Sequence, residues 1–195
     1  MRTAVSARTE PSTEARPVTR LATRTPEGTS NIVLVLDDRV DETGVLWIRV
    51  RLAVLGKLNT GWVPRRALGG YGTVRTQLVV DLEALTATLL REGREIFRAD
   101  IGVGEPSWPT PTGEFYIRNR LTGYASPMYG PIAFGTSARS RTLTDWPAGG
   151  FVGIHGTDQP DLLPGRVSHG CVRMRNADIL RLARLMPVGT PVRIR

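Results

Sequence analysis

The sequence predicts a mainly β protein of two modules with one helix near its C-terminus. Three observations support this prediction. Short apolar segments with the two-residue alternation of strands recur along the chain, and Gly, Asp and Pro residues separate them. A GGYG segment at residues 69–72 divides the predicted strands into two groups. Only one segment, close to the end of the chain, has convincing helical spacing.

The first group of strands is predicted to follow a flexible tail. Residues 1–29 are rich in Thr, Pro, Arg and Glu and have few apolar residues, so we expect them to be disordered. Strands are predicted at 31–36 and 45–52, and in the latter Leu46, Ile48, Val50 and Leu52 alternate with Trp47, Arg49 and Arg51. A turn at 59–61 and a short strand before Pro64 complete a small all-β barrel over residues 30–70.

The second group spans residues 74–195. Strands are predicted at 75–82, 86–92, 94–104, 115–118, 149–156 and 190–195. Residues 121–150 are rich in Gly, Pro, Ser and Thr, and we expect a long irregular loop there, of the kind that often forms a lid.

The helix is predicted over residues 176–186. Asn176 suits the N-cap, Asp178 suits the first turn, and Pro187 ends the helix. Its apolar face is predicted to consist of Ile179, Leu180, Ala183 and Met186.

Composition excludes several classes of protein. The 195 residues are 41% hydrophobic and 23% charged, which suits a soluble globular protein. The longest aliphatic run covers only residues 32–36, whereas a membrane-spanning helix needs about 20 apolar residues. No signal peptide or anchor is visible, because the first residues lack an apolar segment. The single cysteine, Cys171, excludes an intrachain disulfide framework.

The charge is strongly basic, with a net value of +8. All 26 basic residues except Lys57 are arginines, and arginine binds carboxylates and phosphates in a bidentate manner. The arginines are nevertheless spread along the chain and form no basic run or nucleic-acid motif. We therefore interpret them as a general feature of the composition and predict no nucleic-acid partner.

The chemistry-bearing residues gather late in the chain. His155, His169 and Cys171 are its entire stock of His and Cys, and they fall within 17 residues. Gly170 lets backbone approach the cysteine, and the field of the following helix favours a thiolate. A thiolate beside a histidine is an activated nucleophile, and backbone N–H groups at such a turn could face an oxyanion. The spacing alone does not choose between the two histidines as base.

Two other interpretations of these residues remain open. Two histidines and one cysteine could form a three-ligand zinc site, but the 13-residue gap is not a standard spacing and no acidic residue flanks His155. Cys171 could also be a buried structural residue, since cysteine is among the most buried residue types.

The segment IHGTDQPDLLPGRVSHGCVRMRNADILRLARLMPVGTPVRI resembles the catalytic end of the L,D-transpeptidase (YkuD-type) family. That family has a histidine, a gap of a dozen or more residues, Ser/Thr-His-Gly-Cys, a spacer and Asn or Arg. PTPTGEFYI is similar to the family's stretch before its lid, so the resemblance covers residues 74–195. GWVPRRAL is similar to a bacterial SH3-like module. The implied architecture is an SH3-like barrel at 30–70 followed by a β-sandwich-like catalytic domain with a lid.

The resemblance also implies roles for individual residues. Cys171 would be the nucleophile and His155 its general base, oriented by the backbone carbonyl of Gly156. Backbone N–H groups of His169, Gly170 and Cys171 would surround the oxyanion. Substrate-side residues would be Ser168, Arg173, Asn176, Tyr129 and Trp146. No cofactor or metal is implied.

The implied reaction is acyl transfer on peptidoglycan stem peptides. A thioester on the cysteine would pass the stem to an acceptor amine and form a 3→3 cross-link, and carbapenems would act as inhibitors. The alternatives are an L,D-carboxypeptidase, in which water takes the acyl group, and a cell-wall binding protein without activity. The family implies an extracytoplasmic location.

Overall fold

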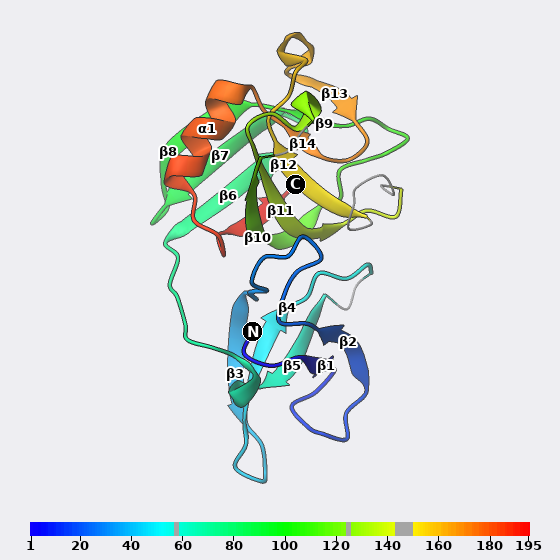
Figure 1. Cartoon of the computed structure of the whole chain (residues 1–195), viewed down its shortest axis with the longest axis vertical. Helices are drawn as coiled ribbons and strands as arrows, with labels where there is room; N and C mark the ends of the chain where they lie inside the picture. The colour runs from blue at the N-terminus through cyan, green and yellow to red at the C-terminus, as the bar shows by residue number, and fades with distance from the viewer. Residues whose placement is uncertain (57–58, 124–125, 143–149) are drawn as a thin grey trace. The chain divides into compact units, whose positions relative to one another are not determined.

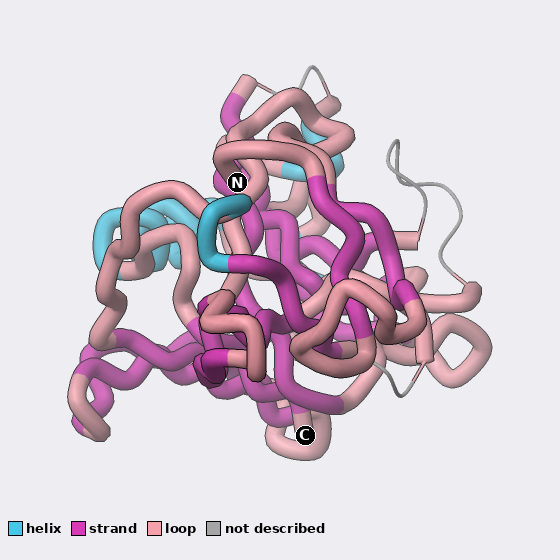
Figure 2. Tube along the Cα trace, turned by 90° about the horizontal axis from the view of Figure 1, so that it is seen from below, coloured by secondary structure: helices cyan, strands magenta, loops and turns pink. Residues whose placement is uncertain are grey.

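The chain folds into two compact units, Met1–Thr73 and Val74–Arg195. The computed structural model describes residues 1–56, 59–123, 126–142 and 150–195. Strands and loops make up nearly all of the trace (Figures 1 and 2). The mainly β class with a late helix is therefore confirmed. In the described ranges, no helix is long and apolar enough to cross a membrane.

The first unit contains an antiparallel sheet in the order β2-β1-β5-β4-β3. Its strands are β1 (Val5–Arg8), β2 (Pro17–Leu21), β3 (Val35–Val40), β4 (Leu46–Arg51) and β5 (Thr60–Pro64). Alternate residues of these strands face one buried cluster, which comprises Ala7, Leu21, Ile48, Val50, Leu52, Val63 and Leu68. The resemblance of this unit to an SH3-like barrel stays a prediction.

The expected flexible tail over residues 1–29 is wrong. Strand β1 lies between β2 and β5, and Ala7 is completely buried in the core of the unit. Leu21 of β2 packs into the same cluster. Val5 and Val18 of the same strands pack against it while partly buried. Because a strand places only every second residue in the core, a few apolar residues can hold these strands. Average composition does not reveal such a pattern.

Two further boundaries in this unit differ from the prediction. The strand expected at 31–36 begins only at Val35, and it is exposed along its length at the edge of the sheet. The turn expected at 59–61 lies largely within β5. Trp47, predicted on the outward face of its strand, is buried there because its Nε1–H donates to Asp41 Oδ2 at 2.8 Å.

The second unit contains a ten-stranded sheet in the order β13-β9-β14-β12-β11-β10-β15-β6-β7-β8. The strands are β6 (Thr76–Asp81), β7 (Thr86–Arg91), β8 (Arg94–Asp100), β9 (Gly102–Gly104), β10 (Gly113–Thr122), β11 (Ile132–Arg139), β12 (Phe151–His155), β13 (Gly165–Ser168), β14 (Val172–Arg173) and β15 (Pro191–Ile194).

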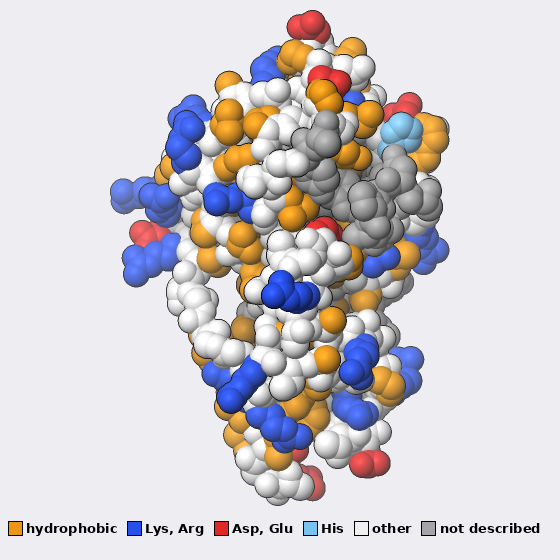
Figure 3. Space-filling model, in the orientation of Figure 1, with side chains coloured by type: hydrophobic (Ala, Val, Ile, Leu, Met, Phe, Trp, Pro, Cys, Tyr) orange, Lys and Arg blue, Asp and Glu red, His pale blue; other side chains and the backbone are white. Residues whose placement is uncertain are grey.

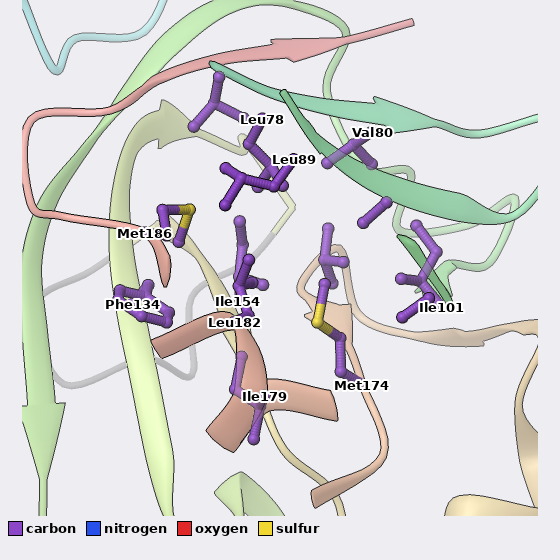
Figure 4. Packing of buried hydrophobic residues seen from close by; sticks show 14 of the residues in the cluster. Leu78, Val80, Leu89, Ile101, Phe134, Ile154, Met174, Ile179, Leu182 and Met186 are labelled. Atoms are coloured by element: carbon purple, nitrogen blue, oxygen red, sulfur yellow. The ribbon is translucent and has the colours of Figure 1, made fainter. Parts of the chain in front are cut away.

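Strand β10 joins the two halves of this sheet. Its first residues pair with β15 and its last residues pair with β11. Side chains from both halves then meet in one core, in which Leu78, Leu89, Phe134 and Ile154 are completely buried (Figure 4). This arrangement agrees with the sandwich-like fold that the resemblance implies.

Helix α1 (Asn176–Leu185) closes this core, as predicted. Its buried residues are Ile179, Leu182 and Ala183, followed by Met186 just after the helix. The prediction of Leu180 on the buried face is wrong, since this side chain is 39% exposed. Steps of three and four residues from Ile179 lead to Leu182, Ala183 and Met186, which is the true apolar stripe.

Other elements of the second unit were not predicted from the sequence. The single strand expected at 94–104 is two strands, of which β8 lies at one edge and β9 lies between β13 and β14. The irregular loop expected at 121–150 contains the 3₁₀ helix η2 (Pro127–Tyr129) and the buried strand β11. Strand β11 buries Thr136 because its hydroxyl donates to the Val152 carbonyl at 2.7 Å, so a polar residue fits a central strand.

The order of the N-terminal strands can be tested with Ala7→Asp in the full chain. A carboxylate at this buried position should lower the free energy of unfolding of the first unit by about 3 kcal/mol or more. Hydrogen exchange in β5 peptides should then accelerate. The control is Ala4→Asp at an exposed position, which should leave exchange unchanged. Equal exchange in the two variants would show that residues 1–21 are a dispensable tail.

Candidate active site

Cys171 stands directly before β14, which runs parallel to β12. The register places Ile154 opposite Val172 and His155 opposite Arg173. Gly153 is therefore opposite Cys171, and its N–H donates to the Cys171 Sγ at 3.3 Å. Because side chains alternate between faces, Cys171 and His155 lie on the same face of the two strands. The side chains of Cys171 and His155 are thus neighbours, although the two residues are sixteen positions apart in the sequence.

His155 is held in one tautomer. Its Nδ1 lies 2.6 Å from the carbonyl oxygen of Gly156. A carbonyl only accepts hydrogen bonds, so Nδ1 carries the proton and Nε2 keeps its lone pair. The pKa of His155 is lowered to about 4, mainly by burial and to a smaller extent by the positive charge of Arg173, while the bond to Gly156 opposes this shift. The ring is therefore neutral at physiological pH and available to accept a proton.

The loop before the cysteine is held by two hydroxyl groups. Ser168 is buried, its Oγ accepts the Gly170 N–H at 3.1 Å, and its O–H donates to the Cys171 carbonyl at 2.5 Å. Thr110 donates to the Gly170 carbonyl at 2.9 Å and accepts the Gly104 N–H at 2.8 Å. Gly170 has φ +116°, a conformation that favours glycine.

These bonds change two expectations. Ser168, expected to line a substrate pocket, is only 1% exposed and spends both of its hydrogen bonds inside the loop. The Gly170 N–H, expected at the oxyanion, already donates to Ser168. Thr110 is a positioning residue that the sequence did not reveal, although it lies within the PTPTG segment.

His169 points away from the base position. Its ring stacks on Trp108 with a centroid distance of 4.3 Å and an interplanar angle of 53°. The side chain is exposed, whereas His155 is buried beside Tyr129, with ring centroids 5.0 Å apart in an edge-on contact. The structure thus brings Tyr129 to His155. Trp146 lies outside the described residues.

Asn176 supports the histidine from behind. The structure gives Arg175 as the N-cap of α1, without a side-chain bond, so the predicted cap at Asn176 is wrong. The Asn176 Oδ1 instead accepts the Thr157 N–H at 3.0 Å. A Cβ on Gly156 or on Gly130 would collide with this oxygen, so the amide packs tightly against the backbone that carries the Gly156 carbonyl.

Arg173 supplies the positive charge of the site. Its Nη1 lies 3.5 Å from Gln159 Oε1, and its Nε is buried with no hydrogen-bond partner among the described residues. Arg175, the other cation considered near the cysteine, is 3.5 Å from Asp100 and donates to the Leu163 carbonyl. Arg173 is therefore the arginine with donors to spare for an anionic ligand. In the described ranges, no group of three His, Cys, Asp or Glu residues is placed to hold a metal ion.

Comparison with known proteins identifies the family of the second unit. A sequence profile described as the L,D-transpeptidase catalytic domain of the YkuD type matches residues 75–194. The chain belongs to this family. It is 37% identical over 122 residues to the L,D-transpeptidase YkuD of Bacillus subtilis, which covers 63% of this chain and 67% of that protein.

A solved structure also resembles the second unit. The crystal structure of a cysteine-to-serine mutant of the Enterococcus faecium L,D-transpeptidase aligns with 63% of this chain at 28% identity and a TM-score of 0.50. The aligned part is 50% of that protein, so the chain matches about half of its length. Family membership therefore applies to the second unit, since the profile matches residues 75–194.

The low pKa of His155 predicts a stability change in acid. Its folded value of about 4 lies below its ordinary value of 6.5, so the unfolded chain binds the proton more tightly. The resulting loss of stability is absent above pH 6.5 and grows to about 3 kcal/mol as the pH falls to 4. Urea unfolding of wild type and His155→Asn at pH 7.5 and 4 measures this loss. The other titrating groups are the same in the two proteins, so the difference between them reports the contribution of His155. An equal acid sensitivity would contradict the buried neutral ring.

Asn176→Ala should loosen the Gly156 carbonyl and with it the histidine. We expect the ¹⁵N NMR spectrum of His155 to change from a single Nδ1–H tautomer to a mixture, and the alkylation rate of Cys171 to fall about tenfold. Asn176→Asp keeps an acceptor for the Thr157 N–H and should retain the tautomer. Asp178→Asn perturbs the same helix turn without touching Gly156 and serves as control. An unchanged tautomer in Asn176→Ala would remove this positioning role.

Proposed function

We propose that the chain is a peptidoglycan L,D-transpeptidase that forms 3→3 cross-links through a thioester on Cys171. The observation that carries the proposal is the parallel pairing of β12 and β14, which sets Cys171 beside a neutral histidine of defined tautomer. A thiol next to a histidine base is the arrangement that nucleophilic acyl transfer requires.

In the first half-reaction, the Cys171 sulfur attacks the carbonyl carbon of the peptide bond between the L and D centres of a stem tetrapeptide. His155 Nε2 accepts the thiol proton as the bond forms. It then donates this proton to the nitrogen of the departing D-alanine, and the C–N bond breaks. The stem remains bound as a thioester.

In the second half-reaction, an amine of a neighbouring stem attacks the thioester carbonyl. His155 accepts a proton from this amine, the C–S bond breaks, and the proton returns to the sulfur. The N–H groups of His169 and Cys171 are our candidates for the oxyanion donors, since the Gly170 N–H is engaged by Ser168.

Arg173 is our candidate for holding the substrate. Its Nε–H is unsatisfied among the described residues, and the peptide stem is rich in carboxylates. A carboxylate placed there would also balance the charge that now lowers the pKa of His155. Tyr129, whose ring makes a T-shaped contact with the histidine ring, is our candidate for limiting access of water to the base.

The family acts on the cell wall, and we propose an extracytoplasmic place of action with peptidoglycan stems as partners. Carbapenems should react as substrate analogues, because their strained amide carbonyl is open to attack by a thiol. Acylation of this kind tests the nucleophile without any assumption about the acceptor.

Intact-mass spectrometry after incubation with a carbapenem should show one covalent adduct on the wild-type chain. Cys171→Ala should show none, because the attacking sulfur is absent. An adduct that persists in Cys171→Ala, or the absence of one on folded wild type, would refute the nucleophile.

Two comparisons refine the assignment. His155→Ala should reduce the acylation rate about a hundredfold or more, and His169→Ala much less, because His169 stacks on Trp108. The reverse order would make His169 the base. With a tetrapeptide donor and an acceptor stem, a cross-linked product supports the transpeptidase, whereas release of tripeptide alone would show an L,D-carboxypeptidase.

A further inference from the structure

The sheet of the first unit gathers five arginines on one face. They come from four strands: Arg20 of β2, Arg8 of β1, Arg49 and Arg51 of β4, and Arg39 of β3. The core residues Ala7, Ile48, Val50 and Val63 occupy the alternate positions. We call the five residues the arginine face.

Register and contacts place these side chains together. Arg8 and Arg49 both pair with Trp62 of β5, one from each side. The Arg39 guanidinium lies 5.6 Å from the centre of the Trp62 ring, and Arg49 donates to Thr60 Oγ1 at 3.3 Å. Residues far apart in the sequence, from 8 to 51, therefore share one surface.

Carboxylates neutralise this surface only in part. In the described part of the chain, Arg8, Arg20, Arg39 and Arg49 form no ion pair, whereas arginines of the second unit do, such as Arg98 with Glu95 and Arg193 with Glu114. Two carboxylates lie at this face, since Asp37 pairs with Arg49 in register and Asp41 Oδ2 accepts the Trp47 Nε1–H. The five arginines therefore remain in excess. Figure 3 shows several Lys and Arg side chains on the visible surface of the first unit, among hydrophobic and other side chains.

We propose that the arginine face binds an anionic phosphodiester polymer of the cell wall and so holds the enzyme at its substrate. Strands lie about 4.8 Å apart, so the face spans about 19 Å from β2 to β3, which suits an extended polymer better than a single ion. Guanidinium groups match phosphate in a bidentate manner and stay charged at every physiological pH. The choice of a wall polymer rests on the proposed function, whereas polyanion binding itself does not.

Other anionic partners fit less well. Single-stranded nucleic acids bind by stacking their bases on exposed aromatic rings, but Trp47 and Trp62 are only 2% and 7% exposed. Membrane insertion needs apolar side chains between the cations, and the large exposed hydrophobic residues of this unit, such as Val40 and Leu55, are not among the positions of the arginine face.

The test is cosedimentation of the full chain carrying Cys171→Ala, so that no covalent bond contributes, with Gram-positive cell walls. Half of each wall preparation is treated with hydrofluoric acid, which removes phosphodiester polymers. We expect binding to untreated walls, a loss of at least tenfold in affinity after treatment, and weakening by salt.

Variants assign the binding to the arginine face. The triple change Arg20→Glu, Arg39→Glu and Arg49→Glu should weaken binding at least tenfold, and the milder Gln versions should weaken it less while preserving the fold. The matched control, Arg91→Glu, Arg94→Glu and Arg184→Glu, makes the same charge change at exposed sites of the second unit and should bind as the parent.

Several results would overturn the proposal. Equal binding to treated walls would point to peptide stems instead, and equal affinity for duplex DNA or for anionic vesicles would show unspecific charge attraction. Equal losses in both triple variants would show that net charge matters and the face does not. None of these outcomes bears on Cys171 acylation, which the carbapenem experiment tests separately.

Discussion

The short bond between His155 Nδ1 and the Gly156 carbonyl is the interaction on which the chemistry of this site depends. It selects the tautomer whose Nε2 can accept a proton, although burial and Arg173 both make the ring a weaker base. A carbonyl holds its direction only if its peptide unit is held, and here the Asn176 amide packs against Gly156 and Gly130. Both positions therefore require glycine, because a side chain at either one would displace the Asn176 amide.

The cysteine is held by an independent set of bonds. The parallel pairing of β12 and β14 fixes the position of Cys171 relative to His155. The hydroxyls of Ser168 and Thr110 fix the loop that precedes the cysteine. Both hydroxyls bind backbone atoms, so they shape the path of the chain without taking part in chemistry. The site thus consists of two rigid halves, one for the base and one for the nucleophile, joined by a single pair of strands.

The sequence was sufficient for the motif and for strongly periodic elements. Helix α1 and strands β6 and β7 follow from spacing, and Cys171 and His155 follow from the resemblance. Residue spacing alone left the choice between His155 and His169 open, because it could not show that His169 stacks on Trp108. It also concealed β11, since buried Thr136 satisfies its hydroxyl within the sheet and carries no apolar signal.

The missed strands of the first unit and the unrecognised arginine face have one cause. In β1 and β2, Ala7 and Leu21 point inward while Arg8 and Arg20 point outward, so the segment looks polar on average and its arginines look scattered. A composition-based argument sums over both faces and therefore loses both signals. Once the register is known, the same residues become an ordered sheet with a core on one side and an excess of arginines on the other. The charge of this unit is thus a property of its fold, which is why we assign it a partner.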